Sequence, residues 1–232
     1  SKYLLYAVGE IVLVVIGILI AIQLNQWRNE ASNIRQKQKI LLALKSEFQS
    51  NLAQLDTVQF YNSKIINAYS EIEELIRAVD TIADESRFNQ PFKNLCWTFS
   101  FDPINGALRS GISSGEIHLI DNGRLIDLLF SWEDVVNDSK EESKRQRDHQ
   151  TKSFDLLQDH IRIRAVWSDD FPGVTTSHFP SDIRGLFKDE LFEDYAVFSY
   201  LWAYEYETEL DGIRTKNMEI LELIEREIEK VS

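Results

Sequence analysis

The chain starts with an almost unbroken apolar run and then changes to a pattern in which apolar residues recur every seven positions. The apolar run, residues 4–24, contains 21 residues and a single charge, that of Glu10. A helix rises about 1.5 Å per residue, so this run is about 30 Å long, the thickness of the hydrocarbon core of a bilayer. Aromatic residues typical of a membrane interface flank it: Tyr3, Tyr6 and Trp27. The pattern predicts a transmembrane anchor over residues 1–27.

A cleaved signal peptide is the alternative explanation for an apolar run near the start of a chain. Its apolar region spans about 7–15 residues and ends at a cleavage site made of small residues. The run here is longer, and the stretch that follows it, residues 23–27 (QLNQW), contains no small residue. An anchor that stays in the membrane is therefore the better interpretation.

Residues 28–82 carry the seven-residue repeat as two parallel rows. No glycine or proline occurs in the 73 residues 18–90, so nothing there stops a helix. The first row is Ile34, Leu41, Phe48, Leu55, Asn62, Tyr69 and Ile76, and the second is Lys37, Leu44, Asn51, Val58, Ile65, Ile72 and Val79. Such a repeat predicts long helices packed as in a coiled coil, continuous with the membrane helix. Asn51 and Asn62 interrupt the rows and either set the register of a coiled coil or bond to a neighbouring helix of a bundle.

The connection that follows is rich in aromatic residues. Five of them fall within residues 84–103: Phe88, Phe92, Trp97, Phe99 and Phe101. They indicate either a binding loop or a hydrophobic cap on the end of a bundle. A short helix is expected to start at Asp102-Pro103, since proline suits a first helical turn. The segment 168–182, with two prolines and a glycine, is expected to be a loop closed by Ser181 or Asp182 as a helix cap.

Two more long helices are expected. One starts after Asp121 or Asn122 and runs to about Val166, and its polar middle, residues 137–152, predicts a solvated stretch. The other covers residues 190–231, with Gly212 as a potential break and a core stripe formed by Phe198, Leu201 and Trp202. Together the patterns predict an all-α fold, in which one N-terminal transmembrane helix continues into a coiled-coil-like bundle of long helices. Residues 28–232 form the predicted soluble domain.

The domain that follows the anchor is strongly acidic. The formal net charge of the 232 residues is −13, and within residues 1–30 the charges of Lys2, Glu10, Arg28 and Glu30 cancel. The excess negative charge therefore lies beyond the apolar run. Because an acidic domain repels phosphate backbones, nucleic acid is not expected as a partner.

The sequence carries no recognisable catalytic or metal-binding motif. It contains no CxxC, HExxH or ExxH pair, no phosphate-binding glycine loop and no nucleophile elbow. The four histidines are scattered along the chain: His118, His149, His160 and His178. On one helix, His149 and His160 lie about 16 Å apart, too far to share a zinc ion. We therefore predict no cofactor, no metal and no enzymatic activity, with an unrecognised active site as a remote alternative.

Glu10 is the one ionisable residue inside the apolar run. It lies about 6 Å from the midplane of the span, where an ionised carboxylate costs at least about 2.5 kcal/mol. Gly9, Leu13, Gly17 and Ala21 recur every four residues on one helix face, and the small residues among them allow another helix to approach closely. One interpretation is a helix–helix contact across which Glu10 is hydrogen-bonded, in a homo-oligomer or with another membrane protein. The other is a protonated glutamate, with glycines that merely reflect membrane composition.

The opening stretch KYLLYAVGEIVLVVIGILIA, followed by Gln23, Asn25 and Trp27, resembles the start of an uncharacterised family of single-pass membrane proteins of Bacteroidota. A weaker similarity lies in residues 107–111 and 117–129. Members of that family carry a basic segment before the span, so the resemblance implies an N-terminus in the cytoplasm and a periplasmic C-terminal domain. The resemblance implies no activity.

The charges near the span, counted alone, favour the opposite orientation. Lys2 is the single basic residue before the span, whereas four follow it: Arg28, Arg35, Lys37 and Lys39. The positive-inside rule would then place the large domain in the cytoplasm. Since the chain starts on serine, we expect further residues upstream, and the orientation implied by the resemblance is preferred.

The expected function is that of a scaffold or sensor in the inner membrane. Its anchor and helical bundle would assemble with further copies or with a membrane-protein partner. A homo-oligomeric pore or proton-coupled unit, with Glu10 facing a water-filled lumen, is the alternative from another class.

Overall fold

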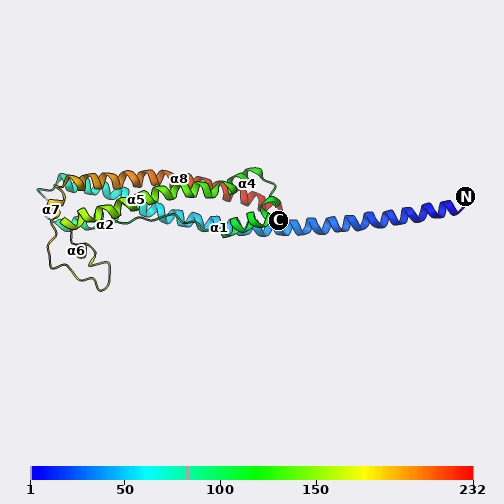
Figure 1. Cartoon of the computed structure of the whole chain (residues 1–232), viewed down its shortest axis with the longest axis horizontal. Helices are drawn as coiled ribbons and strands as arrows, with labels where there is room; N and C mark the ends of the chain where they lie inside the picture. Colours follow the sequence, from blue (N-terminus) through cyan, green and yellow to red (C-terminus); the bar gives the residue numbers. More distant parts are fainter. Residues whose placement is uncertain (1, 82–83, 232) are drawn as a thin grey trace. The chain divides into compact units, whose positions relative to one another are not determined.

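The structure is a computed structural model that describes residues 2–81 and 84–231. Every regular element in these ranges is helical (Figure 1), which confirms the predicted all-α class. In chain order the elements are α1 (Lys2–Arg77), η1 (Glu85–Phe88), α2 (Asn89–Leu95), α3 (Gly106–Ser114), η2 (Glu116–Leu119), α4 (Gly123–Phe130), α5 (Trp132–His160), α6 (Ile163–Trp167), α7 (Ile183–Leu186) and α8 (Glu190–Val231).

The chain divides into two compact units, and the longest helices contribute to both. The first unit consists of residues 1–49, 105–129 and 220–232, and the second of residues 50–104 and 130–219. The predicted domain boundary at residue 27 lies inside α1, a continuous helix of 76 residues. The division into an anchor and a soluble domain therefore remains a prediction about the surroundings of α1.

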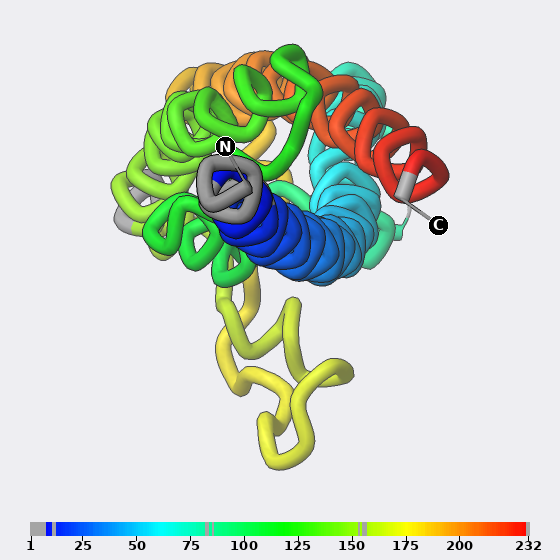
Figure 2. The backbone as a smooth tube through the Cα atoms, turned by 90° about the vertical axis from the view of Figure 1, so that its right-hand side faces the viewer, coloured from blue at the N-terminus to red at the C-terminus, as the bar shows by residue number. Residues whose placement is uncertain are grey.

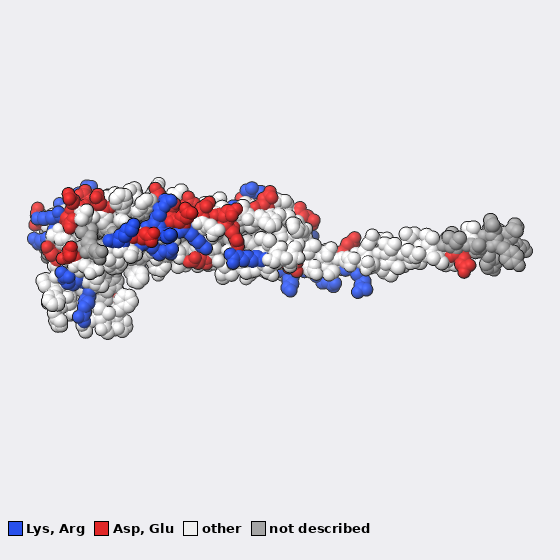
Figure 3. Space-filling model, viewed as in Figure 1, with Lys and Arg blue, Asp and Glu red and all other residues white. Residues whose placement is uncertain are grey.

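The first part of α1 stands without covering neighbours in its unit. Every described side chain from Val8 to Ala31 is exposed, and this is the one helix in the described part of the chain long and apolar enough to cross a membrane. The space-filling view shows it as a white stretch between charged groups (Figure 3). Burial of the predicted rows starts only at Lys37, because Ile34 is still half exposed.

The first unit packs α3, η2, α4 and the end of α8 onto α1. Its core is wholly aliphatic apart from Phe48, with contributions from Ile40, Leu41, Leu44, Leu108, Ile117, Ile120, Leu125, Leu128, Leu129, Ile220 and Ile224. Gly111 makes the close approach of α3 possible. A Cβ at this position would lie 2.9 Å from Cδ1 of Ile40 and 3.2 Å from Cδ1 of Ile117.

The second unit is built on the rest of α1, on α5 and on most of α8. Asn51 donates to the carbonyl of Ile104 (2.9 Å) and accepts the backbone N–H of the same residue (2.8 Å). Asn62 donates to the carbonyl of Ala203 on α8 (2.8 Å) and to Oε2 of Glu207 (2.7 Å). Both asparagines thus replace an apolar contact by hydrogen bonds to another part of the same unit.

Helix boundaries differ from the sequence-based expectation in three places. The helix expected from residue 121 to residue 166 is three helices, because the chain turns at Ser131 and becomes extended at Ile161. Helix α3 starts at Gly106 rather than at Asp102-Pro103, since Asn51 holds Ile104 in a non-helical segment. Helix α8 runs through Gly212 without a break. The expected cap of α7 is confirmed, because the side chain of Asp182 accepts the N–H of Gly185 at 2.8 Å.

The prediction that the middle of α5 is a solvated stretch is wrong for one face of this helix. Ser139, Ser143 and Gln146 are at most 2% exposed and continue the buried row of Trp132 and Val136. Because serine is small and glutamine ends in a polar amide, the seven-residue repeat of this buried row is not visible as an apolar pattern in the sequence. The interior of this unit is therefore polar along α5.

The predicted core stripe of α8 is also displaced. Phe198 and Leu201 are 45% and 43% exposed, whereas Ser199 and Ala203 are buried. The buried row recurs at spacings of three and four residues: Phe192, Tyr195, Ser199, Ala203, Tyr206, Leu210, Ile213, Asn217, Ile220, Ile224 and Glu227. A small residue at position 203 lets Asn62 reach the backbone of α8, so side-chain size was the wrong guide to burial here.

Replacing Tyr206 by phenylalanine is expected to lower the free energy of unfolding by about 1–3 kcal/mol, because it leaves a buried N–H without an acceptor. The hydroxyl of Tyr206 accepts the backbone N–H of Phe101 at 3.0 Å, and burial raises its pKa to about 12. Urea denaturation followed by circular dichroism measures the change. Tyr204→Phe, at a 58% exposed position of the same helix, serves as the control and should be neutral.

Replacing Gln146 by methionine is expected to raise the free energy of unfolding by about 1–2 kcal/mol. The side chain is 2% exposed, and neither its amide nitrogen nor its oxygen has a hydrogen-bond partner among the described protein groups. The same denaturation experiment tests this, with the exposed Gln158→Met as control. A loss of stability would contradict the prediction and show that the amide is hydrogen-bonded in solution.

Candidate functional site

The membrane segment presents its small residues and its carboxylate on an open surface. Gly9, Gly17 and Ala21 are exposed, and a Cβ at either glycine would have no atom within 4 Å outside the helix backbone. Glu10, next to Gly9, is exposed as well. No described part of the chain covers this face. The structure therefore leaves the predicted assembly face available without showing what it binds.

A cluster of charges around the buried side chains of Lys37 and Glu227 fixes α1 in the first unit shortly after the apolar run ends. The ammonium of Lys37 lies 2.8 Å from Oδ2 of Asp121 and 3.1 Å from Oε2 of Glu227. The other oxygen of Glu227 accepts from Lys230 (2.5 Å) and from the amide of Asn122 (3.4 Å). Three segments distant in sequence thus meet at one point: α1, the residues before α4, and the end of α8.

Burial and pairing act in opposite directions on the charges of this cluster. The Glu227 side chain is fully buried and that of Lys37 is 8% exposed. Burial favours their neutral forms, but the surrounding hydrogen bonds outweigh it. The pKa of Lys37 is held above 10.5 and that of Glu227 below 4.5, while the Lys37 ammonium also lowers the pKa of Asp121. All three groups are therefore charged at neutral pH.

A second buried carboxylate ties α3 to α1. Glu47 is 6% exposed, and its two oxygens accept the backbone N–H groups of Ala107 (2.6 Å) and Leu108 (3.0 Å). These are among the free N–H groups of the first turn of α3, where the helix dipole favours a negative charge. The carboxylate that caps α3 is supplied by a residue 60 positions earlier in the chain.

Residues 10–130 match the profile of a Family of unknown function (DUF6090). The chain belongs to this family. No curated protein and no solved structure matches the chain significantly. The matched range contains most of the apolar run, the two buried anchoring points Lys37 and Glu47, and helices α3 and α4.

The short motif at residues 107–111 (ALRSG) now has a physical explanation within the family range. Its first two N–H groups bind Glu47, Leu108 is buried, and Gly111 leaves room for Ile40. No motif in the sequence pointed to Glu47 or Glu227, because a single glutamate in a helix is normally solvated. Neither residue lies in the two seven-residue rows of residues 28–82.

The histidines do not converge. The described residues contain no group of three or more His, Cys, Asp or Glu placed to hold a metal ion. His149 lies 3.2 Å from the carbonyl of Tyr195, His160 pairs with Asp189 at 3.0 Å, and His178 is exposed. Burial raises the pKa of the Cys96 thiol to about 12, which keeps it protonated and unreactive at neutral pH.

The aromatic connection after α1 divides into two parts. Phe88, Phe92 and Phe101 are at most 1% exposed and belong to the core of the second unit, as a hydrophobic cap would. Trp97 is 49% exposed and Phe99 is partly exposed. The hydrophobic-cap interpretation therefore holds for the three buried phenylalanines, and a binding loop remains a prediction for the exposed part of the segment.

Replacing Lys37 by methionine is expected to destabilise the first unit by about 3 kcal/mol, because Glu227 then stays buried with one partner fewer. Amide hydrogen exchange at residues 220–231 and in α3 should accelerate, while the exposed Lys39→Met leaves it unchanged. The wild-type cluster should lose its contribution as the pH falls below 4.5 or rises above 10.5, through the shifted pKa values of Glu227 and Lys37.

The double variant Lys37→Met/Glu227→Met separates charge from packing. It should recover most of the stability, since no uncompensated charge remains buried. If it exchanges as fast as Lys37→Met alone, loss of side-chain packing and not the buried charge is the cause.

Proposed function

We propose that this protein is a membrane-anchored helical sensor or scaffold that assembles through its apolar N-terminal helix. The observation that carries the proposal is the fully exposed apolar stretch of α1, which includes a carboxylate and a row of small residues. Exposed in water, such a surface would aggregate. Buried in a bilayer, it would still leave Glu10 in need of a hydrogen-bonding partner.

The small residues support a second helix as that partner. Gly9, Gly17 and Ala21 let another backbone approach α1 closely, and Glu10 lies beside them, within reach of a polar group on the approaching helix. A further copy of this chain provides such a helix. A different membrane protein with a polar residue at the same depth would serve equally.

The continuity of α1 supports a sensor role over that of a passive anchor. The same helix carries the apolar run and the buried contacts of both compact units. A displacement of the membrane part would therefore strain the Lys37 and Glu47 contacts directly. The polar interior beside α5, with Ser143 and Gln146 lacking hydrogen-bond partners among the described protein groups, leaves the packing of the second unit weak enough to rearrange.

We further propose the inner membrane as the location, with residues 28–232 in the periplasm. The resemblance of the opening motif to single-pass proteins of Bacteroidota supports this orientation. An acidic domain that follows the span suits either side of the membrane, because acidic residues contribute little to topology.

Native mass spectrometry of the protein in nanodiscs tests the assembly. We expect a mass at two or more times the 27.0 kDa of one chain, or a complex with a second protein when the sample is taken from its native membrane. Gly17→Leu should shift the equilibrium toward the monomer at least about tenfold, since a leucine separates the helices. Val15→Leu, on the opposite face, is the control and should leave the mass distribution unchanged.

Glu10→Gln distinguishes the scaffold from a pore. An amide can still bond across helices, so the scaffold should assemble as before. Loss of proton or ion conductance in liposomes with assembly intact would instead favour the alternative, a homo-oligomeric pore lined by Glu10. A wild-type protein that is monomeric and alone in its native membrane would overturn both proposals.

A further inference from the structure

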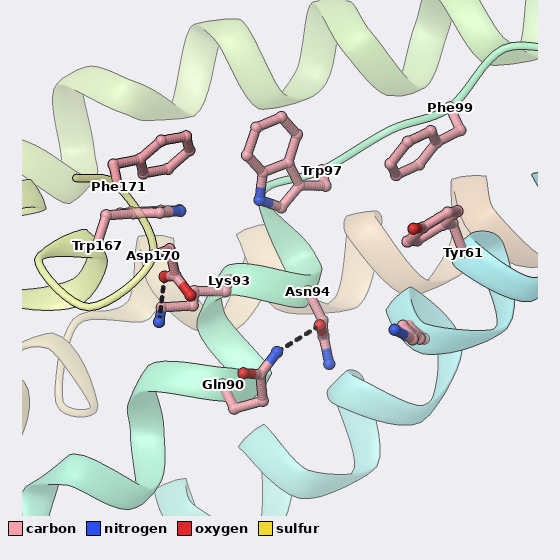
Figure 4. Close-up of a pocket in the computed structure, with 10 residues that line it drawn as sticks. Tyr61, Gln90, Lys93, Asn94, Trp97, Phe99, Trp167, Asp170 and Phe171 are labelled. Carbon is pink, nitrogen blue, oxygen red and sulfur yellow. Dashed lines mark hydrogen bonds and ion pairs between the residues drawn. The ribbon is translucent and has the colours of Figure 1, made fainter.

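The second unit carries a pocket that membrane assembly leaves unused. It has a volume of about 310 Å³ and lies between α1, α2, the segment after α2, and α6 with its following loop (Figure 4). That loop extends to one side of the long helices of this unit (Figure 2). Ligand pockets in proteins start at about 300 Å³, so this one is suited to a ligand of one or two rings.

The walls of the pocket are aromatic and partly exposed. Trp97 is 49% and Phe171 46% exposed, and Trp167 stands beside them (Figure 4). On the side of α1, the rings of Tyr61 and Phe99 are stacked, with centroids 4.0 Å apart. Large aromatic side chains usually bury most of their surface. Several exposed rings around one cavity indicate faces kept open for a ligand.

The polar groups of the pocket are held in place by each other. Lys93 pairs with Oδ2 of Asp170 at 2.5 Å, and the amide nitrogen of Gln90 donates to the side-chain oxygen of Asn94 at 3.0 Å. The second pair leaves the oxygen of Gln90 and the nitrogen of Asn94 for a ligand. One acceptor and one donor, already oriented, lie side by side, which suits hydroxyl or acetamido groups that both donate and accept.

A single unpaired cation lies at the edge of the pocket. The ammonium of Lys64 is 4.5 Å from the ring centroid of Phe60 and 5.2 Å from that of Tyr61. No carboxylate in the described part of the chain pairs with it. In a protein with a net charge of −13, an uncompensated lysine beside a pocket marks the position for an acidic group of the ligand.

We propose that this pocket binds a pyranose ring of a saccharide that carries a carboxylate. A sugar ring has an apolar face of C–H groups and a rim of hydroxyls. The apolar face of the sugar stacks on Trp97 or Phe171. Its hydroxyls form hydrogen bonds with the amides of Gln90 and Asn94, and its carboxylate pairs with the ammonium of Lys64. The site lies wholly within the second unit and does not depend on the assembly of α1.

Other ligand classes fit less well. An aromatic side chain of a peptide would cover the walls but leave the oriented amides without partners, which costs affinity. A nucleotide would bring several negative charges to a single free lysine in a strongly acidic protein. A neutral sugar satisfies the walls and the amides but leaves Lys64 unused.

The test uses the full chain in detergent and two probes that differ by one lactyl carboxylate, N-acetylglucosamine and N-acetylmuramic acid. Ligand-observed NMR and tryptophan fluorescence measure the dissociation constants. We expect both sugars to bind, the acid about fivefold or more tightly. Trp97→Ala should weaken both at least about tenfold, and Lys64→Met should abolish the preference for the acid while the neutral sugar binds as before.

Two further variants distinguish a loss of sugar binding from a loss of folding. Phe171→Ala alters the loop after α6 instead of the segment after α2 and should weaken both sugars as well. Phe130→Ala, at a 48% exposed position outside the pocket, should change neither constant. Absence of binding for both sugars, binding that survives Trp97→Ala, or binding of a tryptophan-containing tripeptide in preference to the sugars would each overturn the proposal.

Discussion

One helix carries two different kinds of surface, and the rest of the structure depends on how α1 combines them. Its first part is apolar on every side, as a helix surrounded by lipid must be. From Lys37 onward the apolar residues narrow to a seven-residue stripe, and the other faces become polar. Because no glycine or proline interrupts the change, the same rigid element carries the membrane segment and the contacts of both compact units.

The start of the buried part of α1 is marked by buried charges rather than by apolar packing alone. Lys37, Glu47 and Glu227 are buried in the first unit, whose core is mainly aliphatic, and each is paired or accepts backbone N–H groups. An apolar triad of similar volume would pack at least as stably. The buried charges favour one position of α1 over others, because a shifted or rotated α1 would leave them buried and unpaired. The first unit thereby fixes one register of α1, and this makes any displacement of the membrane part costly.

The second unit combines a weakly specified interior with an open aromatic pocket. Serine, alanine and glutamine occupy the buried row of α5 and α8 where leucine would give a tighter core. The pocket collects Trp97, Phe99 and Trp167 from segments that also supply buried phenylalanines to the core next to it. A ligand bound between α2 and the loop after α6 would couple these two segments, and such coupling is what a sensor requires.

The sequence alone determined the helical class, the extent of α8, the position of α1 to within a few residues of its end, and the apolar segment, because helix period and apolar length are local properties. It misjudged positions where the buried residue is small or polar. Phe198 looked like core and is half exposed, while Ser139, Ser143 and Ala203 looked solvated or neutral and are buried. Only the tertiary structure decided these, and also the partners of Lys37 and Glu47 and the membership of the aromatic pocket. Each of them depends on contacts between residues far apart in the chain, and side-chain polarity at a single position does not determine which face of a helix meets its neighbour.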